Sequence, residues 1–261
     1  MALTLSVVDT AGTELFHAEG ADMVQLDLMN QPFRSGDRIV VETYEDLTEL
    51  EIMLDPALGP CTVLLKGGRL EFPIPFDKAR KPYHPSAFLG NRIWGYARLL
   101  DSRERSNYRN LALNTHDLSD QNTFFPHAST NSGATDERFA ARCAIDGVTQ
   151  TCLHGDWPYA SWGINGRDDA WLQIDFGRSI EAHELKIFNR ADYPHDSWWK
   201  QVEVTLSDGT ELALDTQKTG APQAFDLGGR SIEWIRLHDL VRGDDGKFPA
   251  LSQIQVWGYA R

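Results

Sequence analysis

The sequence predicts an all-β protein built from two β-sandwich (jelly-roll) domains, and three observations lead to this prediction. Apolar and polar residues alternate with a period of two in many short runs, which is the pattern of strands with one buried face. Turn residues, mainly Gly and Pro, separate these runs. No run is followed by a helix long enough to connect parallel strands, and this excludes parallel α/β folds.

The strands expected in the N-terminal half follow this alternation. It is clearest at residues 3–7 and 24–28, where every second residue is apolar. The turn sequence Lys-Gly-Gly-Arg at residues 66–69 predicts a hairpin between the strand before it and residues 70–72. Further strands are expected at residues 38–43, 49–54, 61–65 and 91–100.

Residues 102–113 form the only segment whose apolar spacing favours a helix. Ser102 is a suitable N-cap, and Tyr108, Leu111 and Ala112 are spaced i, i+3 and i+4, which places them on one face. A polar stretch follows this segment. We therefore expect a domain boundary near residue 120, so that a domain at 1–120 ends in a short helical linker to a domain at 121–261.

The alternation is more regular in the C-terminal half. Strands are expected at residues 172–176 and 202–206, and Asp208-Gly209 predicts a hairpin that leads the second of these into the next strand. Residues 235–237 and 254–256 are expected to supply the last core strands.

Composition excludes several classes of partner. The net charge of −13 argues against nucleic acid and anionic lipid, because binding to phosphates needs a surplus of Lys and Arg. No apolar run approaches the roughly 20 residues that span a bilayer.

The first nine residues lack the basic start of a signal peptide, which predicts a cytoplasmic protein, or a secreted one if a leader has been removed. The three cysteines, Cys61, Cys143 and Cys152, are expected to be reduced, although Cys143 and Cys152 could pair.

Two loops in the C-terminal half carry aromatic and polar side chains together. A sugar ring presents an apolar C–H face that packs on an aromatic ring, and hydroxyls that need hydrogen-bonding partners. The loop at residues 189–199 offers both kinds of group, and the loop at 154–162 is expected to form the opposite wall. The candidate ligand-binding residues are Asn189, Arg190, His195, Asp196, Trp198, Trp199, His154, Asp156 and Trp157.

Structural roles compete with ligand binding at several of these positions. Arg190 could form an internal ion pair with Asp192 or Asp196. Trp198 and Trp199 are neighbours near a strand start, so their side chains point to opposite faces and at most one should be core. If Arg190 and Trp198 face a ligand, replacing either with Ala should abolish binding without changing stability. Core or structural roles are expected for Trp162, Trp234 and Trp257.

Four short motifs give the C-terminal half a family resemblance. They are Ala-Ile-Asp-Gly at 144–147, Trp-Leu-Gln-Ile-Asp-Phe-Gly at 171–177, Ser-Asp-Gly at 207–209, and the segment 250–258. In order and spacing, residues 125–260 resemble the discoidin (coagulation factor V/VIII type C) domain, also known as the family 32 carbohydrate-binding module. The resemblance implies a discoidin-like, eight-stranded antiparallel jelly roll with ligand loops at one end. It implies a saccharide as partner, for which we expect a terminal hexose such as galactose.

The resemblance also implies a structural Ca²⁺ ion. Such an ion takes six to eight oxygen ligands from carboxylates, hydroxyls and backbone carbonyls. Gln253 departs from the family, in which Glu is commoner; its amide oxygen can still ligate, but the affinity should fall because one charge is lost. The alternative is that Asp146-Gly147 is merely a turn. The positions implied as ligands are Cys143 (carbonyl), Asp146, Val148 or Gln150 (carbonyl), Thr151, Ala250 (carbonyl) and Gln253.

The sequence therefore predicts non-catalytic carbohydrate binding through the loops of the C-terminal sandwich. No motif of a hydrolase, metalloprotease or phosphate-binding enzyme occurs. One alternative is a protein-interaction or scaffolding module. A further alternative is a glycan-active enzyme with its site between the domains. Separately, His154, Asp156, His195 and Asp196 could converge in the C-terminal loops and act as acid and base, although the same residues also suit the binding of hydroxyls.

Overall fold

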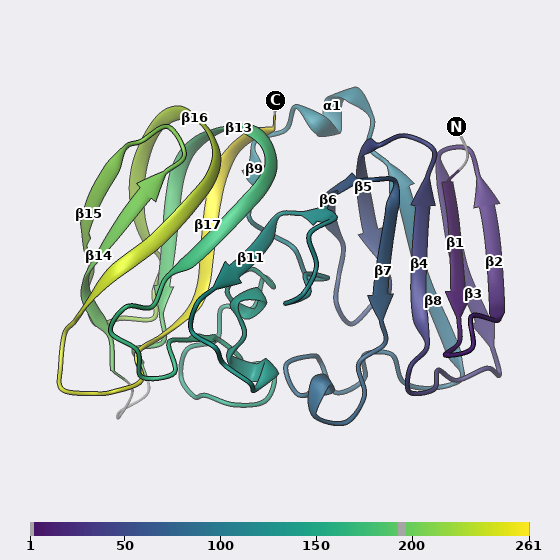
Figure 1. Cartoon of the computed structure of the whole chain (residues 1–261), viewed down its shortest axis with the longest axis horizontal. Coiled ribbons are helices and arrows are strands. Elements are labelled where there is room, and N and C mark those ends of the chain that lie inside the picture. The colour runs from purple at the N-terminus through teal and green to yellow at the C-terminus, as the bar shows by residue number, and fades with distance from the viewer. Residues whose placement is uncertain (1–2, 193–196, 261) are drawn as a thin grey trace.

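The structure, a computed structural model, describes residues 3–192 and 197–260. Within these ranges it is all-β, as predicted, with three antiparallel sheets. Figure 1 shows two lobes side by side: an N-terminal lobe, strands β1–β8 and β10, and a C-terminal lobe, strands β9 and β11–β17. No helix in the described ranges has the length and apolar character needed to cross a membrane.

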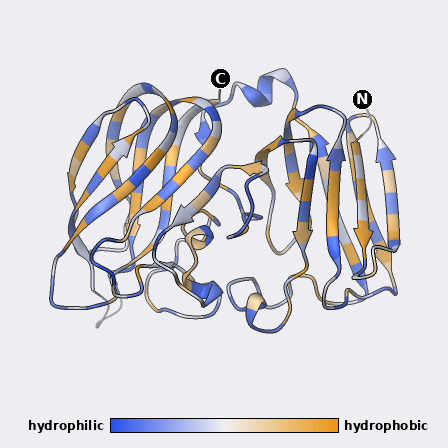
Figure 2. Cartoon of the chain, in the orientation of Figure 1, coloured by the Kyte–Doolittle hydropathy of each residue, from blue (hydrophilic) through white to orange (hydrophobic). Residues whose placement is uncertain are grey.

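The N-terminal lobe contains two sheets whose apolar faces meet. The four-stranded sheet has the order β2 (Glu14–Gly20), β1 (Leu3–Val8), β4 (Arg38–Thr43), β7 (Arg69–Pro73). The five-stranded sheet has the order β10 (Phe124–Phe125), β6 (Cys61–Lys66), β5 (Leu47–Met53), β8 (Arg92–Leu99), β3 (Met23–Met29). Side chains from both sheets form one hydrophobic cluster that includes Leu5, Ile39, Ile52 and Phe72. Figure 2 shows the alternation of hydrophobic and hydrophilic residues along these strands, which is the pattern that predicted them.

The hairpin predicted between β6 and β7 is wrong. β6 pairs with β5 and β10, whereas β7 pairs with β4 in the other sheet. Gly67 and Gly68 both have positive φ, 74° and 67°, and Gly68 lies so close to the end of β4 that a Cβ atom there would be 2.7 Å from the Thr43 carbonyl oxygen. The turn therefore carries the chain from one sheet across to the other instead of folding it back.

The expected helix is reduced to a single turn. α1 spans Ser102–Arg105, and its N-cap is Asp101, not Ser102: the Asp101 carboxylate accepts the backbone N–H groups of residues 103 and 104, each at 2.8 Å. The chain is extended again at β9 (Arg109–Asn110), which pairs with β17, because this pairing outweighs the helical spacing. Leu111 then packs into the C-terminal core and Leu113 against the N-terminal one, so this segment belongs to both lobes. The boundary near residue 120 stays a prediction.

The C-terminal lobe is a sheet of eight antiparallel strands, of which β11–β17 lie within residues 125–260, the range of the resemblance, and β9 lies before it. The path is β12 (Trp162–Gly163), β17 (Ala250–Ala260), β13 (Leu172–Asn189), β16 (Gln223–Arg242), β14 (Trp199–Leu206), β15 (Glu211–Asp215); β11 (His127–Thr130) pairs with β13, and β9 with β17. Register shifts in the β13–β16 pair allow the sheet to bend over a single core, in which Trp162 and Trp199 lie with ring centroids 5.8 Å apart. The hairpin at Asp208-Gly209 joins β14 to β15 as predicted. The 3₁₀ turns are η1 (Asp77–Arg80), η2 (Glu137–Phe139) and η3 (Ala141–Ala144).

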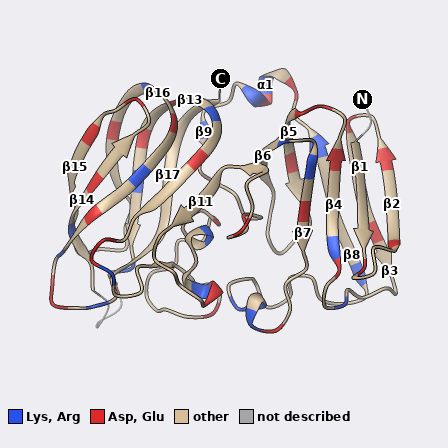
Figure 3. Ribbon diagram, in the orientation of Figure 1, with Lys and Arg blue, Asp and Glu red and all other residues tan. Residues whose placement is uncertain are grey.

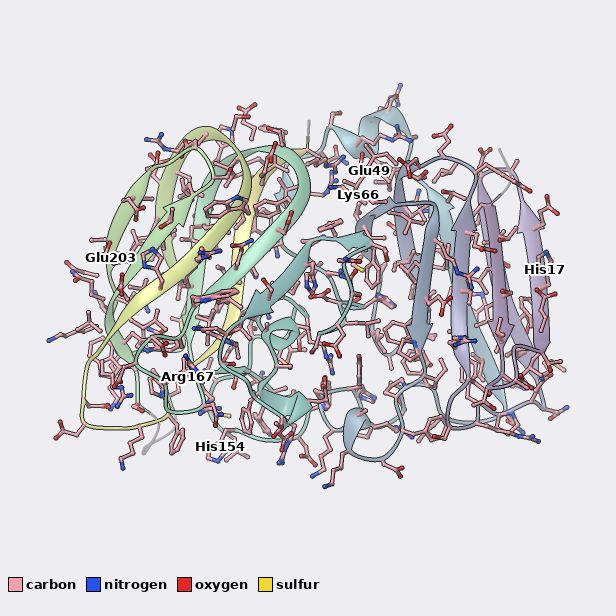
Figure 4. All side chains as sticks on the ribbon, viewed as in Figure 1. His17, Glu49, Lys66, His154, Arg167 and Glu203 are labelled. Carbon is pink, nitrogen blue, oxygen red and sulfur yellow. The ribbon has the colours of Figure 1, made fainter. Side chains whose placement is uncertain are left out.

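The two lobes are joined by an ion cluster around Glu49, a residue of β5 that is only 7% exposed. Its carboxylate accepts a hydrogen bond from Arg178 of β13 and one of 3.0 Å from Arg109 of β9, and Arg105 lies 3.9 Å away. Burial alone would raise the pKa of Glu49, but the arginines outweigh it and lower the pKa. Figure 4 labels Glu49 between the lobes. Figure 3 shows acidic and basic residues interspersed over both lobes.

A buried histidine makes stability sensitive to mild acid. The His116 ring is fully buried, its Nε2 accepts the Leu54 N–H at 3.1 Å, and burial lowers its pKa to about 3. In the unfolded chain the pKa is about 6.5, so the unfolded state binds one more proton between these two values. The stability that neutral His116 contributes is therefore complete above pH 6.5 and is lost as the pH falls towards 3.

This dependence predicts the behaviour of His116→Gln, whose amide oxygen can accept the same N–H but does not titrate. Between pH 6 and 4, the free energy of unfolding of the natural protein should fall more steeply than that of the variant, by about 1.4 kcal/mol per pH unit. Urea unfolding at several pH values measures both slopes. Equal slopes would show that His116 does not set this dependence.

Candidate functional site

A pocket of about 440 Å³ opens at one end of the C-terminal lobe. Its walls come from the segment that leads into η2, residues 163–165, the start of the loop after β13 and the loop between β16 and β17, together with His154 and Ser197. Figure 1 shows these loops together at the lower end of the lobe. The described residues that define its chemistry are Asp136, Phe139, His154, Arg190, Lys247 and Phe248.

Arg190 lies at the pocket as a fixed group and is only 4% exposed. Its Nη1 donates to Ser161 Oγ at 2.9 Å and its Nη2 to the Phe248 carbonyl at 3.5 Å. The guanidinium carbon is 5.9 Å from the centroid of the Phe139 ring, and the backbone N–H donates to the Ala250 carbonyl at 3.0 Å. Because these contacts hold the side chain in place, its planar set of N–H donors is already oriented for a ligand that carries oxygen acceptors.

Two phenylalanines supply the aromatic surface of the pocket. Phe248 is 61% exposed and lies at the end of the polar loop 243–247. Phe139 is half-buried, against Gly163. Neither ring was predicted from the sequence, although a single aromatic residue in a loop of Gly, Asp and Lys is a signal that could have identified Phe248.

The acidic wall of the pocket is held by Arg138. Its guanidinium contacts the Asp136 carboxylate at 2.6 Å and the Asp156 carboxylate at 2.9 Å. The hydrogen bonds from Arg138 lower the pKa of Asp136 to about 2. At neutral pH Asp136 is therefore a carboxylate that can accept hydrogen bonds from hydroxyls, and it holds no proton to give to a substrate.

The structure places Asn189 and Trp199 away from this pocket, because both are fully buried. Asn189 Nδ2 donates to Thr216 Oγ1 at 3.2 Å, and Trp199 begins β14 with its indole in the core. Trp198 is half-buried against Gly243 and does not line the pocket. One of the two neighbouring indoles is therefore core, as the strand alternation predicted, and neither contributes an aromatic face at the pocket.

The loop at 154–162 forms less of the opposite wall than expected. His154 lines the pocket, at the end of the lobe where Figure 4 labels it. Trp157 instead packs on His84 of the N-terminal lobe, with ring centroids 4.4 Å apart, and Asp156 belongs to the Arg138 network and lies 4.0 Å from Lys81. The remaining two candidates, His195 and Asp196, lie outside the described residues.

The positions implied as Ca²⁺ ligands come together only in part. The carbonyls of Cys143 and Val148 converge with Asp146 and Gln253, but Thr151 donates to the Asp192 carboxylate at 2.6 Å and the Ala250 carbonyl accepts the Arg190 N–H. Among the described residues, no three His, Cys, Asp or Glu side chains are grouped so that they could hold a metal ion. Burial raises the pKa of Asp146 to about 7. All three cysteines are free, as expected.

A second cavity, of about 310 Å³, lies between the lobes and bears on the alternative of an enzyme. Among its described lining residues is one thiol, Cys61, whose Sγ is 3.3 Å from His116 Nδ1. Burial raises the pKa of Cys61 to about 11. Because His116 Nε2 accepts the Leu54 N–H, its proton lies on Nδ1, which then cannot accept the thiol proton. This pair is therefore unsuited to nucleophilic catalysis.

No protein-family model matches the chain, and no curated protein sequence matches it. Solved structures of carbohydrate-binding modules and of a lectin domain match about half or more of the chain. Chitosan-binding module 1 of a chitosanase/glucanase from Paenibacillus sp. IK-5 is 21% identical, with 57% of this chain and 99% of that chain covered and a TM-score of 0.42. The lectin domain of lectinolysin, solved with Lewis B antigen, is 19% identical (58% and 98% covered, TM-score 0.43). The family 32 module from C. perfringens NanJ, solved with galactose, is also 19% identical (50% and 91% covered, TM-score 0.37).

Proposed function

We propose that the protein binds a saccharide in the pocket at the loop end of the C-terminal lobe, without catalysing a reaction on it. The observation that carries this proposal is the pairing of a fixed guanidinium, Arg190, with an exposed aromatic ring, Phe248, in one pocket. A sugar needs both groups, because its C–H face packs on a ring and its hydroxyl oxygens accept hydrogen bonds. The Asp136 carboxylate adds an acceptor for hydroxyl protons.

The size of the pocket supports a small ligand. A volume of about 440 Å³ lies within the roughly 300–1,000 Å³ of small-molecule sites. We infer that the ligand is a terminal hexose, with galactose as the first candidate, because the sequence resemblance points to that class. A glycan array that includes galactose, N-acetylgalactosamine, fucose, Lewis B antigen and chitosan tests this most broadly, since these are the sugars named for the matched structures.

Phe248→Ala should reduce saccharide affinity at least tenfold while the unfolding midpoint stays the same. A ring that is covered by the sugar contributes about 1.5–3 kcal/mol, which corresponds to a factor of about 10 to 150. Stability should not change because the ring is largely exposed before the ligand binds. Isothermal titration calorimetry with the best ligand from the array measures the affinity, and differential scanning calorimetry measures the midpoint.

Tyr44→Ala is the matched control, because Tyr44 is an aromatic residue that is 80% exposed on the N-terminal lobe. It should bind the sugar with unchanged affinity. Binding by Phe248→Ala at the affinity of the natural protein, or no binding of any arrayed saccharide by the natural protein, would contradict the proposal.

A further inference from the structure

The side-chain amide of Gln253 lies in a ring of oxygen atoms where the loop 143–148 meets β17. Gln253 is fully buried. Its Nε2 is 3.1 Å from Asp146 Oδ1 and 3.2 Å from the Ser252 carbonyl, and the carbonyls of Val148 and Cys143 follow at 3.4 and 3.5 Å. Four oxygens from two distant segments therefore surround one nitrogen atom.

The partners on both sides of the amide determine its orientation. Gln253 Oε1 accepts the backbone N–H of Gly147 at 3.1 Å, whereas the oxygens around Nε2 are three backbone carbonyls and Asp146 Oδ1, which already accepts the Val148 N–H at 2.8 Å. Rotating the amide by 180° would place its oxygen against four oxygens and its N–H groups against another N–H. The nitrogen therefore belongs at the centre of the ring.

This arrangement does not fit the Ca²⁺ ion that the family resemblance implies. Calcium takes six to eight oxygens at 2.3–2.6 Å. The NH₂ nitrogen of a neutral amide is a hydrogen-bond donor with no available lone pair, so it cannot be one of these ligands. The nitrogen stands in the middle of the oxygens that would ligate the ion, and Thr151 and the Ala250 carbonyl are engaged elsewhere. Asp146 is also the only carboxylate in the ring, so an ion there would gain little charge compensation.

We propose that the amide of Gln253 takes the place of the cation and joins the loop 143–148 to β17 without a metal. The two N–H groups carry partial positive charge and donate to the oxygens that an ion would otherwise bind. The Oε1 atom fixes the loop at Gly147 in addition, which an ion cannot do. This inference is independent of saccharide binding.

The first test uses the natural protein. Its thermal unfolding midpoint should be the same in 2 mM EDTA and in about 2 mM CaCl₂, because a site that binds no calcium gains no stability from it. Calcium titration by calorimetry should likewise show no binding. A midpoint that rises with calcium, or a measurable heat of binding, would overturn the proposal.

The second test is a gain of function. Gln253→Glu places a second carboxylate in the ring, so the variant should become calcium-responsive, with a midpoint raised by roughly 5 °C or more in calcium relative to EDTA. Gln255→Glu, two residues along the same strand, is the control and should not respond. If Gln253→Glu folds but its unfolding midpoint is the same in calcium and in EDTA, the ring of oxygens is not shaped for a cation, and the proposal is overturned. If Gln253→Glu folds neither in calcium nor in EDTA, the calcium dependence of the natural protein's unfolding midpoint, measured in the first test, decides between the outcomes.

Discussion

Replacing Arg190 with Ala is expected to abolish saccharide binding and to lower the free energy of unfolding by about 2–3 kcal/mol. Binding should be lost because the guanidinium is a pre-oriented donor to hydroxyl oxygens in the proposed site. Stability is lost because the side chain is buried and donates to Ser161 Oγ and to the Phe248 carbonyl. Hydrogen bonds from a charged group contribute about 1.5–3 kcal/mol. Calorimetric titration with the best ligand from the array and urea unfolding measure the two effects.

If Arg190 were only an exposed residue on a loop, its replacement would abolish binding and leave stability unchanged. The expected loss of stability therefore distinguishes a buried Arg190 from an exposed one. The matched control is Arg167→Ala, whose exposed ion pair with Asp169 should contribute almost nothing to stability. An Arg190→Ala protein as stable as the natural one would show that the guanidinium is not held as the structure has it. Undiminished affinity would remove Arg190 from the binding site.

Replacing Glu49 with Ala is expected to cost about 3 kcal/mol and to loosen the junction of the two lobes. The substitution leaves Arg178 and Arg109 without the carboxylate between them, and removing one partner of a buried ion pair costs about 3–5 kcal/mol. Because Arg178 and Arg109 are partly exposed, we expect the lower end of this range. Differential scanning calorimetry should show a lower midpoint and a broader or divided transition.

Glu45→Ala is the control for this effect, since Glu45 is exposed and lies at the turn before the same strand. It should leave the calorimetric transition unchanged. If Glu49→Ala unfolds like the natural protein, the ion cluster does not couple the lobes, and their relation depends on apolar packing instead.

The strands were largely predictable because their signal is local. Residues 38–43 form β4 and residues 24–28 lie within β3, since alternation with a period of two requires only that one face be buried. Which strands pair is a different matter. Gly67-Gly68 has the composition of a hairpin turn, but whether it folds back or crosses to the other sheet depends on the end of β4, some 24 residues earlier in the chain.

The shortened helix has a similar explanation. The spacing of Tyr108, Leu111 and Ala112 is helical, yet it also arises by chance in an extended segment. Pairing of β9 with β17, about 150 residues later in the chain, decides the outcome, and no local pattern reveals it.

The candidate site was predicted at the level of loops more than of side chains. Arg190 and His154 do line the pocket, because both belong to loops at the end of the sandwich. Among the predicted aromatic residues, Trp199 lies in the core, whereas the rings that line this pocket are those of Phe248 and Phe139. Indole side chains are the largest apolar groups, so they serve the core as readily as a ligand, and sequence alone does not separate these roles.

The most direct test of the central claim, that a saccharide binds in the loop-end pocket, is chemical-shift mapping. The backbone amides of the ¹⁵N-labelled protein are followed by NMR while the best arrayed saccharide is added. The largest shifts should fall at residues 134–139, 163–165 and 246–250, which line the pocket. Shifts that cluster instead at residues 108–113, beside the cavity between the lobes, or anywhere else away from the loop end, would contradict it.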